Sequence, residues 1–339
     1  MIDFSKWPTG GAPKEEGRLV VPYLDVEGED EPIDFLFALD GKHQIIARSN
    51  LHTIQGTKKA GKSAAGIALI VAALKGEFIG ITPSRKDLAV LWIDTEQDKN
   101  TLRQKAHAVR SMASLNVMPE RVKIVTLRGY GGPAEVLAIT LQAIEENAAD
   151  LVFLDGVVDL CESFNDEEKS RDVVRQLESL AEQRGAAILG LIHTNKYNDE
   201  ARGHLGAIMQ QKSAEIYLVN KEGNTAKVTQ PFSRFAPVPA FSFTFADDFK
   251  IMPPAGGNKE KELFSDLYIK FAPLFSDNGW KTRKELANLY QEYYGVSKRT
   301  AESEITAAYR SHALAKEVKG KNVYYSLPLN NIDAEEDDL

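Results

Sequence analysis

Short runs of consecutive apolar residues alternate with longer stretches of helical periodicity between residues 34 and 251. Runs that are apolar at every position are typical of strands buried on both faces of a parallel sheet, with helices packed on each side. The pattern therefore predicts an α/β fold with a mostly parallel central sheet, extended at its far edge by hairpins. The expected strands are LHTIQG (51–56), LAVLWID (88–94), VKIVTL (122–127), LVFLD (151–155), AAILGLIH (186–193) and AEIYLV (214–219), with helices at 63–75, 98–115, 134–147 and 167–184 and hairpin strands at 216–222, 225–230 and 240–245.

The pattern changes at MPPAGGNKEKE, where prolines, glycines and charges predict a linker. Beyond it, three stretches of helical period precede two short strands around a Lys-Gly-Lys-Asn turn. Thr282 and Glu285 have the spacing of a capping box that would begin the second helix. The expected units are an extended arm (1–33), the α/β domain (34–251), the linker (252–262), a small helical module (263–328) and an acidic tail (329–339).

The composition excludes several classes of protein. Hydrophobic residues make up 43% of the chain and charged residues 27%, which is ordinary for a soluble globular protein. The longest apolar run, 64–74, is too short to span a bilayer, and the first residues lack the pattern of a signal peptide. The single cysteine, Cys161, excludes an internal disulfide and a cysteine-based zinc cluster. We therefore expect a cytoplasmic protein without membrane contact.

The charge is distributed unevenly along the chain. A net charge of −8 argues against a protein that coats nucleic acid over its whole surface. Residues 259–328, however, carry 12 Lys and Arg against 9 Asp and Glu, so the small module is mildly basic. The charge balance thus permits a local contact with nucleic acid without requiring one.

One segment has the spacing of a phosphate-binding loop, G-x-x-x-x-G-K-[ST]. In such a loop, successive backbone N–H groups surround a phosphate, the lysine reaches the terminal phosphates and the hydroxyl holds magnesium. The helix that is expected next would point its positive end at the same anion. The motif predicts binding of ATP and Mg²⁺ by Gly56, Thr57, Lys58, Lys59, Ala60, Gly61, Lys62 and Ser63.

Carboxylates follow two of the expected strands. Asp155 ends LVFLD and is the candidate to complete the magnesium shell with Ser63. In LAVLWIDTEQ, an acid just past the strand could polarise the attacking water. Glu96 is the candidate for that role and Asp94 the alternative, because the sequence does not show which of them faces the γ-phosphate; both could also cap the next helix.

With these motifs, residues 35–250 resemble the RecA-like ATPases, and within them hexameric helicases of the DnaB and RepA type. The resemblance continues in LGLIHTNK (189–196), ARGHLGAIMQQKSAEIYLV (201–219) and PFSRFAPVPAFSFTF (231–245). It implies that His193, at a strand end, senses the γ-phosphate, although a buried structural histidine is the alternative. It also implies that the loop from Asn195 to Gly206 lines a central channel and contacts single-stranded DNA. Its polar contacts would be Lys196, Arg202 and His204, against which the acids Asp199 and Glu200 would act.

The same family places an arginine where it reaches the nucleotide of a neighbouring subunit. Arg234 matches that position, so the resemblance implies an arginine finger and a homo-oligomer that assembles as a hexamer. The family's lysine two residues earlier is replaced by Phe232, and its glycine by Ala236, while Pro237 is kept. These departures leave a surface arginine on a hairpin as the alternative.

The small module resembles a winged helix-turn-helix domain in GVSKRTAESEITAAYRSHALAKEVKGKNVYYSLP. Such a domain inserts a recognition helix into the major groove of duplex DNA, although winged helices also serve as protein-docking modules. Glu302 and Glu304 on the same helix would repel phosphates. The resemblance implies DNA contacts by Lys298, Arg299 and Arg310 on the helix and by Lys319 and Lys321 on the wing.

Together these observations predict an ATP-hydrolysing, RecA-like protein that acts on DNA. The first hypothesis is an oligomeric helicase or translocase for replication or mobilisation of a plasmid or integrative element. The second is a non-translocating ATPase that serves recombination, excision or partition, with the small module choosing the DNA site. A small-molecule kinase shares the phosphate-binding loop but not the combination of IDTEQ, the channel loop and Arg234.

Overall fold

The structure is a computed structural model that describes residues 14–15, 18–19, 26, 32–195, 201–254, 267–275, 279–311, 313–319 and 322–327. Most of the predicted arm, the linker beyond residue 254 and the acidic tail lie outside these residues. Within the arm, two strands of two residues, β1 (Lys14–Glu15) and β2 (Arg18–Leu19), pair antiparallel. No helix in the described ranges is long and apolar enough to cross a membrane.

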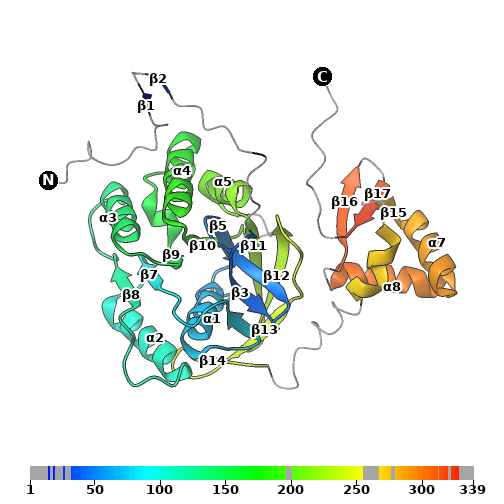
Figure 1. Cartoon of the computed structure of the whole chain (residues 1–339), viewed down its shortest axis with the longest axis horizontal. Coiled ribbons are helices and arrows are strands. Elements are labelled where there is room, and N and C mark those ends of the chain that lie inside the picture. Colours follow the sequence, from blue (N-terminus) through cyan, green and yellow to red (C-terminus); the bar gives the residue numbers. More distant parts are fainter. Residues whose placement is uncertain are drawn as a thin grey trace.

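A nine-stranded sheet in the order β14-β13-β12-β11-β5-β10-β9-β7-β8 forms the centre of the large domain (Figure 1). The strands from β11 to β8 run parallel, and β12, β13 and β14 add antiparallel at the other edge. All the expected strands are confirmed. Their bounds are β5 Leu51–Gly56, β7 Val90–Asp94, β8 Val122–Thr126, β9 Leu151–Asp155, β10 Ala187–His193, β11 Glu215–Glu222, β12 Thr225–Ser233, β13 Phe241–Phe245 and β14 Ile251–Met252.

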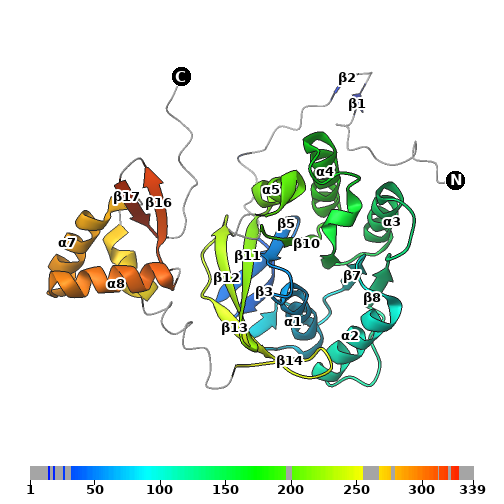
Figure 2. The ribbon, with the colours of Figure 1, turned by 180° about the vertical axis from the view of Figure 1, so that it is seen from behind.

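Helices cover both faces of the sheet, as Figures 1 and 2 show. Successive residues of each central strand enter different cores: Val90 and Trp92 pack with α1 and α2, whereas Leu91 and Ile93 pack with α3, α4 and α5. This alternation explains why the strands are apolar at every position. The helices are α1 Lys62–Lys75, α2 Lys99–Met112, α3 Pro133–Glu146, α4 Glu167–Arg184 and α5 Gly203–Lys212, with a 3₁₀ turn, η2, at Val157–Leu160.

A small antiparallel sheet, β4-β3-β6, which was not predicted from the sequence, lies against the α1 side. It consists of β3 (Phe35–Leu39), β4 (His43–Ala47) and β6 (Ile81–Pro83). Asp40 and Gly41 connect β3 to β4 with positive φ angles of 58° and 65°. An Asp-Gly pair between two apolar runs is a strong hairpin signal, so this hairpin was recognisable from the sequence.

The elements after residue 267 form a separate unit with its own core of Leu267, Phe271, Leu286, Ile305 and other apolar side chains. The predicted capping box is confirmed, since Thr282 and Glu285 each accept a hydrogen bond from the other's backbone N–H. Three helical segments and a three-stranded sheet, β15-β17-β16, make up the unit. Their bounds are helical residues 267–271 continued by η3 Ala272–Phe275, β15 Lys281–Thr282, α7 Arg283–Tyr294, α8 Lys298–Arg310, β16 Ala315–Lys319 and β17 Asn322–Ser326.

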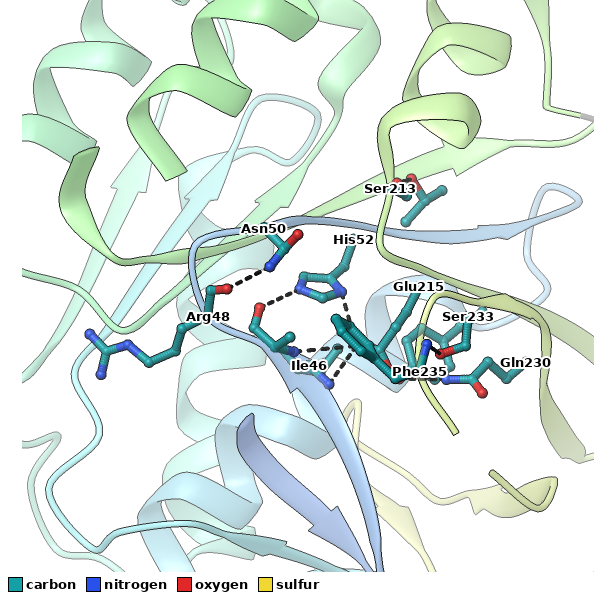
Figure 3. Close-up of polar contacts among 12 residues, drawn as sticks. Ile46, Arg48, Asn50, His52, Ser213, Glu215, Gln230, Ser233 and Phe235 are labelled. Carbon is teal, nitrogen blue, oxygen red and sulfur yellow. Dashed lines mark hydrogen bonds and ion pairs between the residues drawn. The ribbon is translucent and has the colours of Figure 1, made fainter. Parts of the chain in front are cut away.

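A buried polar network ties the small sheet to the strand that carries the phosphate-binding loop (Figure 3). Glu215 on β11 accepts hydrogen bonds from the N–H of Ile46 (2.7 Å), the Tyr217 hydroxyl (2.8 Å) and the Gln230 amide (3.0 Å). His52 on β5 donates through Nε2 to the carbonyl of Ala47 at 2.7 Å and places Nδ1 3.1 Å from the Glu215 carboxylate. Burial, followed by the charge of Glu215, holds the pKa of Tyr217 well above its usual value.

Glu215→Ala is expected to lower the free energy of unfolding by about 3 kcal/mol, because it leaves several buried donors without an acceptor. The matched control is Glu222→Ala, an exposed carboxylate on the same strand, with an expected change within about 0.5 kcal/mol. Urea denaturation followed by circular dichroism measures both changes. A loss below about 1 kcal/mol in Glu215→Ala would show that the network contributes little to stability.

Candidate active site

The phosphate-binding loop connects the buried strand β5 to helix α1 at the edge where the parallel strands end. Gly61 immediately precedes the helix with φ 105°, and Lys59 also lies in the left-handed region with φ 66°. A Cβ on Gly61 would lie 2.8 Å from the ring of Phe245 on β13, so only glycine fits this turn beside that ring. The loop residues predicted from the motif, Gly56 to Ser63, therefore form one continuous turn into the amino end of α1.

Lys62, the first residue of α1, is buried against the loop that precedes it. Its ammonium group donates to the carbonyl oxygens of Gly56 and Thr57, each at 3.0 Å, and lies 3.0 Å from Nδ1 of His193. Burial lowers the pKa of Lys62, although Asp155 and Glu96 oppose this effect. Burial and the charge of Lys62 lower the pKa of His193 as well, which favours a neutral ring whose Nδ1 accepts from the ammonium.

Ser63 and Asp155 meet at one point, with the serine hydroxyl donating to Oδ2 of Asp155 at 2.6 Å. A hydroxyl and a carboxylate are oxygen ligands of the kind that Mg²⁺ uses together with substrate phosphates. The nearby Asp94 carboxylate has one buried oxygen, Oδ2, without a hydrogen-bond partner. The donor set therefore fits a magnesium ion held between this edge of the sheet and the phosphates of a nucleotide.

Lys105 on α2 was not recognised from the sequence as part of this site. Its side chain is buried, and its ammonium lies 3.9 Å from Oδ2 of Asp155. It also opposes the rise of the Asp94 pKa, which burial and the charge of Asp155 cause. The available signal was its position three residues after Leu102 and four before Val109, on the apolar face of an expected helix.

The two acids that follow β7 have different surroundings. Asp94 is buried and its Oδ1 accepts the backbone N–H groups of Glu96 (3.0 Å) and Gln97 (2.7 Å). Glu96 is exposed and makes no such contact with the backbone of its own turn. Although the residue as a whole is exposed, partial burial of its carboxyl group, and then the charges of Asp155, Asp159 and Asp94, raise the pKa of Glu96. The pKa of both acids is raised, so the difference between them is geometric. The Asp94 carboxylate holds the backbone of its own turn, which leaves Glu96 as the candidate to accept a proton from water.

Gly156 brings the ends of β7 and β9 together. It follows Asp155 with φ 107°, and a Cβ at this position would collide with the Thr95 hydroxyl and lie 3.1 Å from Cγ of Glu96. The Thr95 hydroxyl donates to Asp159 at 2.7 Å and to the Gly156 carbonyl at 3.1 Å. The backbone around Glu96 is thus held close to Asp155 by a glycine and a buried threonine.

His193 is a neighbour of Lys62 and lies two residues before the predicted DNA-contacting loop, which was expected to begin at Asn195. Its carbonyl accepts the N–H of Arg202 at 2.9 Å, and Thr194 forms a bridge with Ala201, so the loop between them is closed at its base. The prediction that the loop reaches Gly206 is wrong, because α5 begins at Gly203. Arg202 and His204 are exposed at this junction, whereas Lys196 lies outside the described residues.

Arg234 does not join the other predicted site residues of its own chain. It follows β12, whose last residue, Ser233, pairs with Glu215 at the start of β11. Glu215 in turn lies opposite His52, four residues before Gly56, which corresponds to about 13 Å along the strand. Arg234 is therefore exposed near the amino ends of the parallel strands, whereas the phosphate-binding loop lies at their carboxyl ends. Its backbone N–H donates to the carbonyl of Ala214 at 2.8 Å.

The predicted contacts of the small module are only partly described. Lys298, Arg299 and Arg310 are exposed on α8. Lys298 lies 3.9 Å from Glu302 on the same helix, so the acid predicted to oppose phosphate binding does sit beside one of these bases. Lys319 ends β16 but its side chain, like the whole of Lys321, lies outside the described residues.

Comparison with known protein families gives one match. A family model described as an AAA domain covers residues 24–199, which is more than half of the chain and includes the phosphate-binding loop, Glu96, Asp155 and His193. A search of curated proteins finds no match.

Proposed function

The chain belongs to the AAA domain family of P-loop ATPases, and from this premise we propose that it is an oligomeric, RecA-like motor that hydrolyses ATP to move along single-stranded DNA. Lys62 and His193 contact the γ-phosphate, and Glu96 polarises the attacking water. Ser63 and Asp155 would hold magnesium, which would neutralise charge on the phosphates. A non-translocating ATPase of recombination, excision or partition is the alternative that the experiments below separate from it.

The contact between Lys62 and His193 carries this proposal. The two side chains are 3.0 Å apart, and His193 is followed at once by the closed loop that ends at Arg202. Loss of the γ-phosphate would change the charge that Lys62 and His193 face, and the next residues along the chain belong to the loop. The contact therefore supports a coupling between the state of the bound nucleotide and the loop after His193, which has Arg202 at its base. A translocating ATPase requires such a coupling.

The site of one subunit is completed by Arg234 of a neighbouring copy. Arg234 lies too far along the strands to serve its own phosphates, yet it is exposed and held by its backbone at the opposite edge of the sheet. In a head-to-tail ring, the side of one subunit that carries the phosphate-binding loop faces the other side of the next subunit, where Arg234 lies. An arginine in that place would stabilise the charge that develops during phosphoryl transfer.

Mixing two inactive variants tests this arrangement. Arg234→Ala and Lys62→Ala are each expected to be inactive, whereas their 1:1 mixture regains about a quarter of the wild-type rate, because random assembly brings the two intact halves together at about one site in four. Arg175→Ala, which removes an exposed arginine on α4, is the matched control with unchanged activity. A mixture as inactive as its components would contradict a shared site.

Unwinding of forked DNA with ATP and Mg²⁺, together with sizing in a non-hydrolysable ATP analogue, tests the motor itself. We expect a nucleotide-dependent hexameric ring and hydrolysis that single-stranded DNA stimulates. Stimulated hydrolysis without unwinding would favour the non-translocating alternative.

The small module, as a winged helix, would add duplex binding. Deletion of residues 259–339 should weaken this binding, and the binding should depend on the salt concentration.

A further inference from the structure

A pocket of about 450 Å³ opens at the carboxyl ends of β7, β8 and β9, beside the candidate active site. We call it the edge pocket. Its walls come from the residues after β8, from η2 and the segment that follows it, and from Thr95. The side chains used below are Thr95, Tyr130, Asp159 and Phe164.

Two aromatic rings line the edge pocket from different segments. Tyr130 lies within Arg128-Gly129-Tyr130-Gly131-Gly132 and is 50% exposed, with glycines on both sides of it in the chain. Phe164 is half-buried, and the guanidinium of Arg202 lies over its ring, 5.4 Å from the ring centroid. Exposed aromatic rings with arginines beside them form the usual stacking surface for bases of single-stranded nucleic acid.

The charges around the edge pocket differ between its rim and its wall. Arg128 and Arg202 are exposed at the rim, and the nearest acid to Arg128, Asp98, lies 3.8 Å away in a solvent-exposed pair. Asp159 lines the pocket and accepts the Thr95 hydroxyl through one oxygen at 2.7 Å. A carboxylate in the pocket repels phosphate, but it accepts hydrogen bonds from the exocyclic amino groups of bases.

The edge pocket is continuous with the base of the loop that follows His193. The carbonyl of Phe164 accepts the N–H of Leu205 at 3.1 Å, and a Cβ on Gly203 would lie 2.6 Å from the Phe164 ring. A strand that contacts Arg202 therefore lies within reach of Phe164. On its other side, the pocket reaches Thr95, the residue directly before Glu96.

We propose that the edge pocket receives a base of single-stranded DNA, which stacks on Tyr130 and Phe164 while the adjoining phosphates contact Arg128 and Arg202. The inference rests on the proposed function, because it presumes that the chain binds single-stranded DNA.

The test measures binding of the full chain to a fluorescent single strand, with Mg²⁺ and a non-hydrolysable ATP analogue. Tyr130→Ala is expected to weaken binding by about tenfold, the effect of losing one stacked base, whereas Tyr130→Phe keeps the ring and binds like the wild type. Phe164→Leu, which keeps an apolar side chain beneath Gly203, is expected to weaken binding as well. Tyr293→Ala, at an exposed tyrosine of α7, is the matched control and should leave binding unchanged.

A base analogue gives a second, direct readout. The fluorescence of 2-aminopurine in the strand should be quenched by the wild type and by Tyr130→Phe but not by Tyr130→Ala. If the wild type binds single strands and Tyr130→Ala binds and quenches equally, the edge pocket is not a base site, although the proposed function stands. If Tyr130→Ala instead loses affinity for ATP alone, the pocket serves the nucleotide and the inference is overturned. Failure of the wild type to bind any single strand would refute the proposed function and the inference together.

Discussion

Lys62→Ala is expected to lower the rate of ATP hydrolysis by about 100-fold or more, the cost of removing one group that stabilises charge in a transition state. Within the described residues, Lys62 is the only lysine of the loop whose ammonium contacts both the loop carbonyls and His193. Phosphate release at saturating ATP and Mg²⁺ measures the rate. The Tm should fall modestly, because alanine suits the first turn of α1 but the loop loses the ammonium that donates to the carbonyls of Gly56 and Thr57.

The matched control for this variant is Lys123→Ala, which removes an exposed lysine from the edge strand β8. It should hydrolyse ATP like the wild type. Wild-type turnover in Lys62→Ala would contradict the whole assignment of the site, because every other role is placed relative to this lysine.

Glu96→Gln is expected to lower hydrolysis by about 10²- to 10⁴-fold while nucleotide binding is kept, since the amide fills the same space but cannot accept a proton. Asp94→Asn is the informative comparison. Its Oδ1 still accepts the N–H groups of Glu96 and Gln97, so the turn should hold and the loss of rate should stay within about tenfold.

Single-turnover hydrolysis and binding of a fluorescent ATP analogue separate chemistry from affinity in these two variants. A severe loss in Asp94→Asn combined with near-normal hydrolysis in Glu96→Gln would reverse the assignment and make Asp94 the group that activates water. Loss of nucleotide binding in Glu96→Gln would instead assign Glu96 a role in holding the ligand.

The strands and most helices were predictable because their signals are local. A run such as LVFLD is apolar at each position, and the structure buries every residue of β9 between two layers of helices. The loop from Gly56 to Ser63 was predictable for the same reason, since its phosphate-binding geometry depends on consecutive residues. The resemblance to RecA-like ATPases agrees with the matched AAA domain at this level.

The helix α5 shows where local signals mislead. The resemblance to RecA-like helicases placed the channel loop as far as Gly206, and no helix was expected to begin at Gly203. In the structure, a Cβ on Gly206 would lie 2.8 Å from Cβ of Ala201, so this glycine permits close packing within the turn into the helix. Lys105 was overlooked for a related reason: a lysine reads as a surface residue until a carboxylate is found beside it.

The sequence by itself determined the elements and the chemical groups, because hydrophobic period and motif spacing depend on residues within one turn or strand of each other. Only the tertiary structure decided which groups meet. Lys62 and His193 are 131 positions apart and Ser63 and Asp155 are 92 apart, and they touch because β5, β10 and β9 are neighbours that end at the same edge of the sheet. Because β12 runs antiparallel to β11, its last residue lies near the amino ends of the parallel strands. Arg234, which follows β12, is therefore at the end of the sheet away from the phosphate-binding loop.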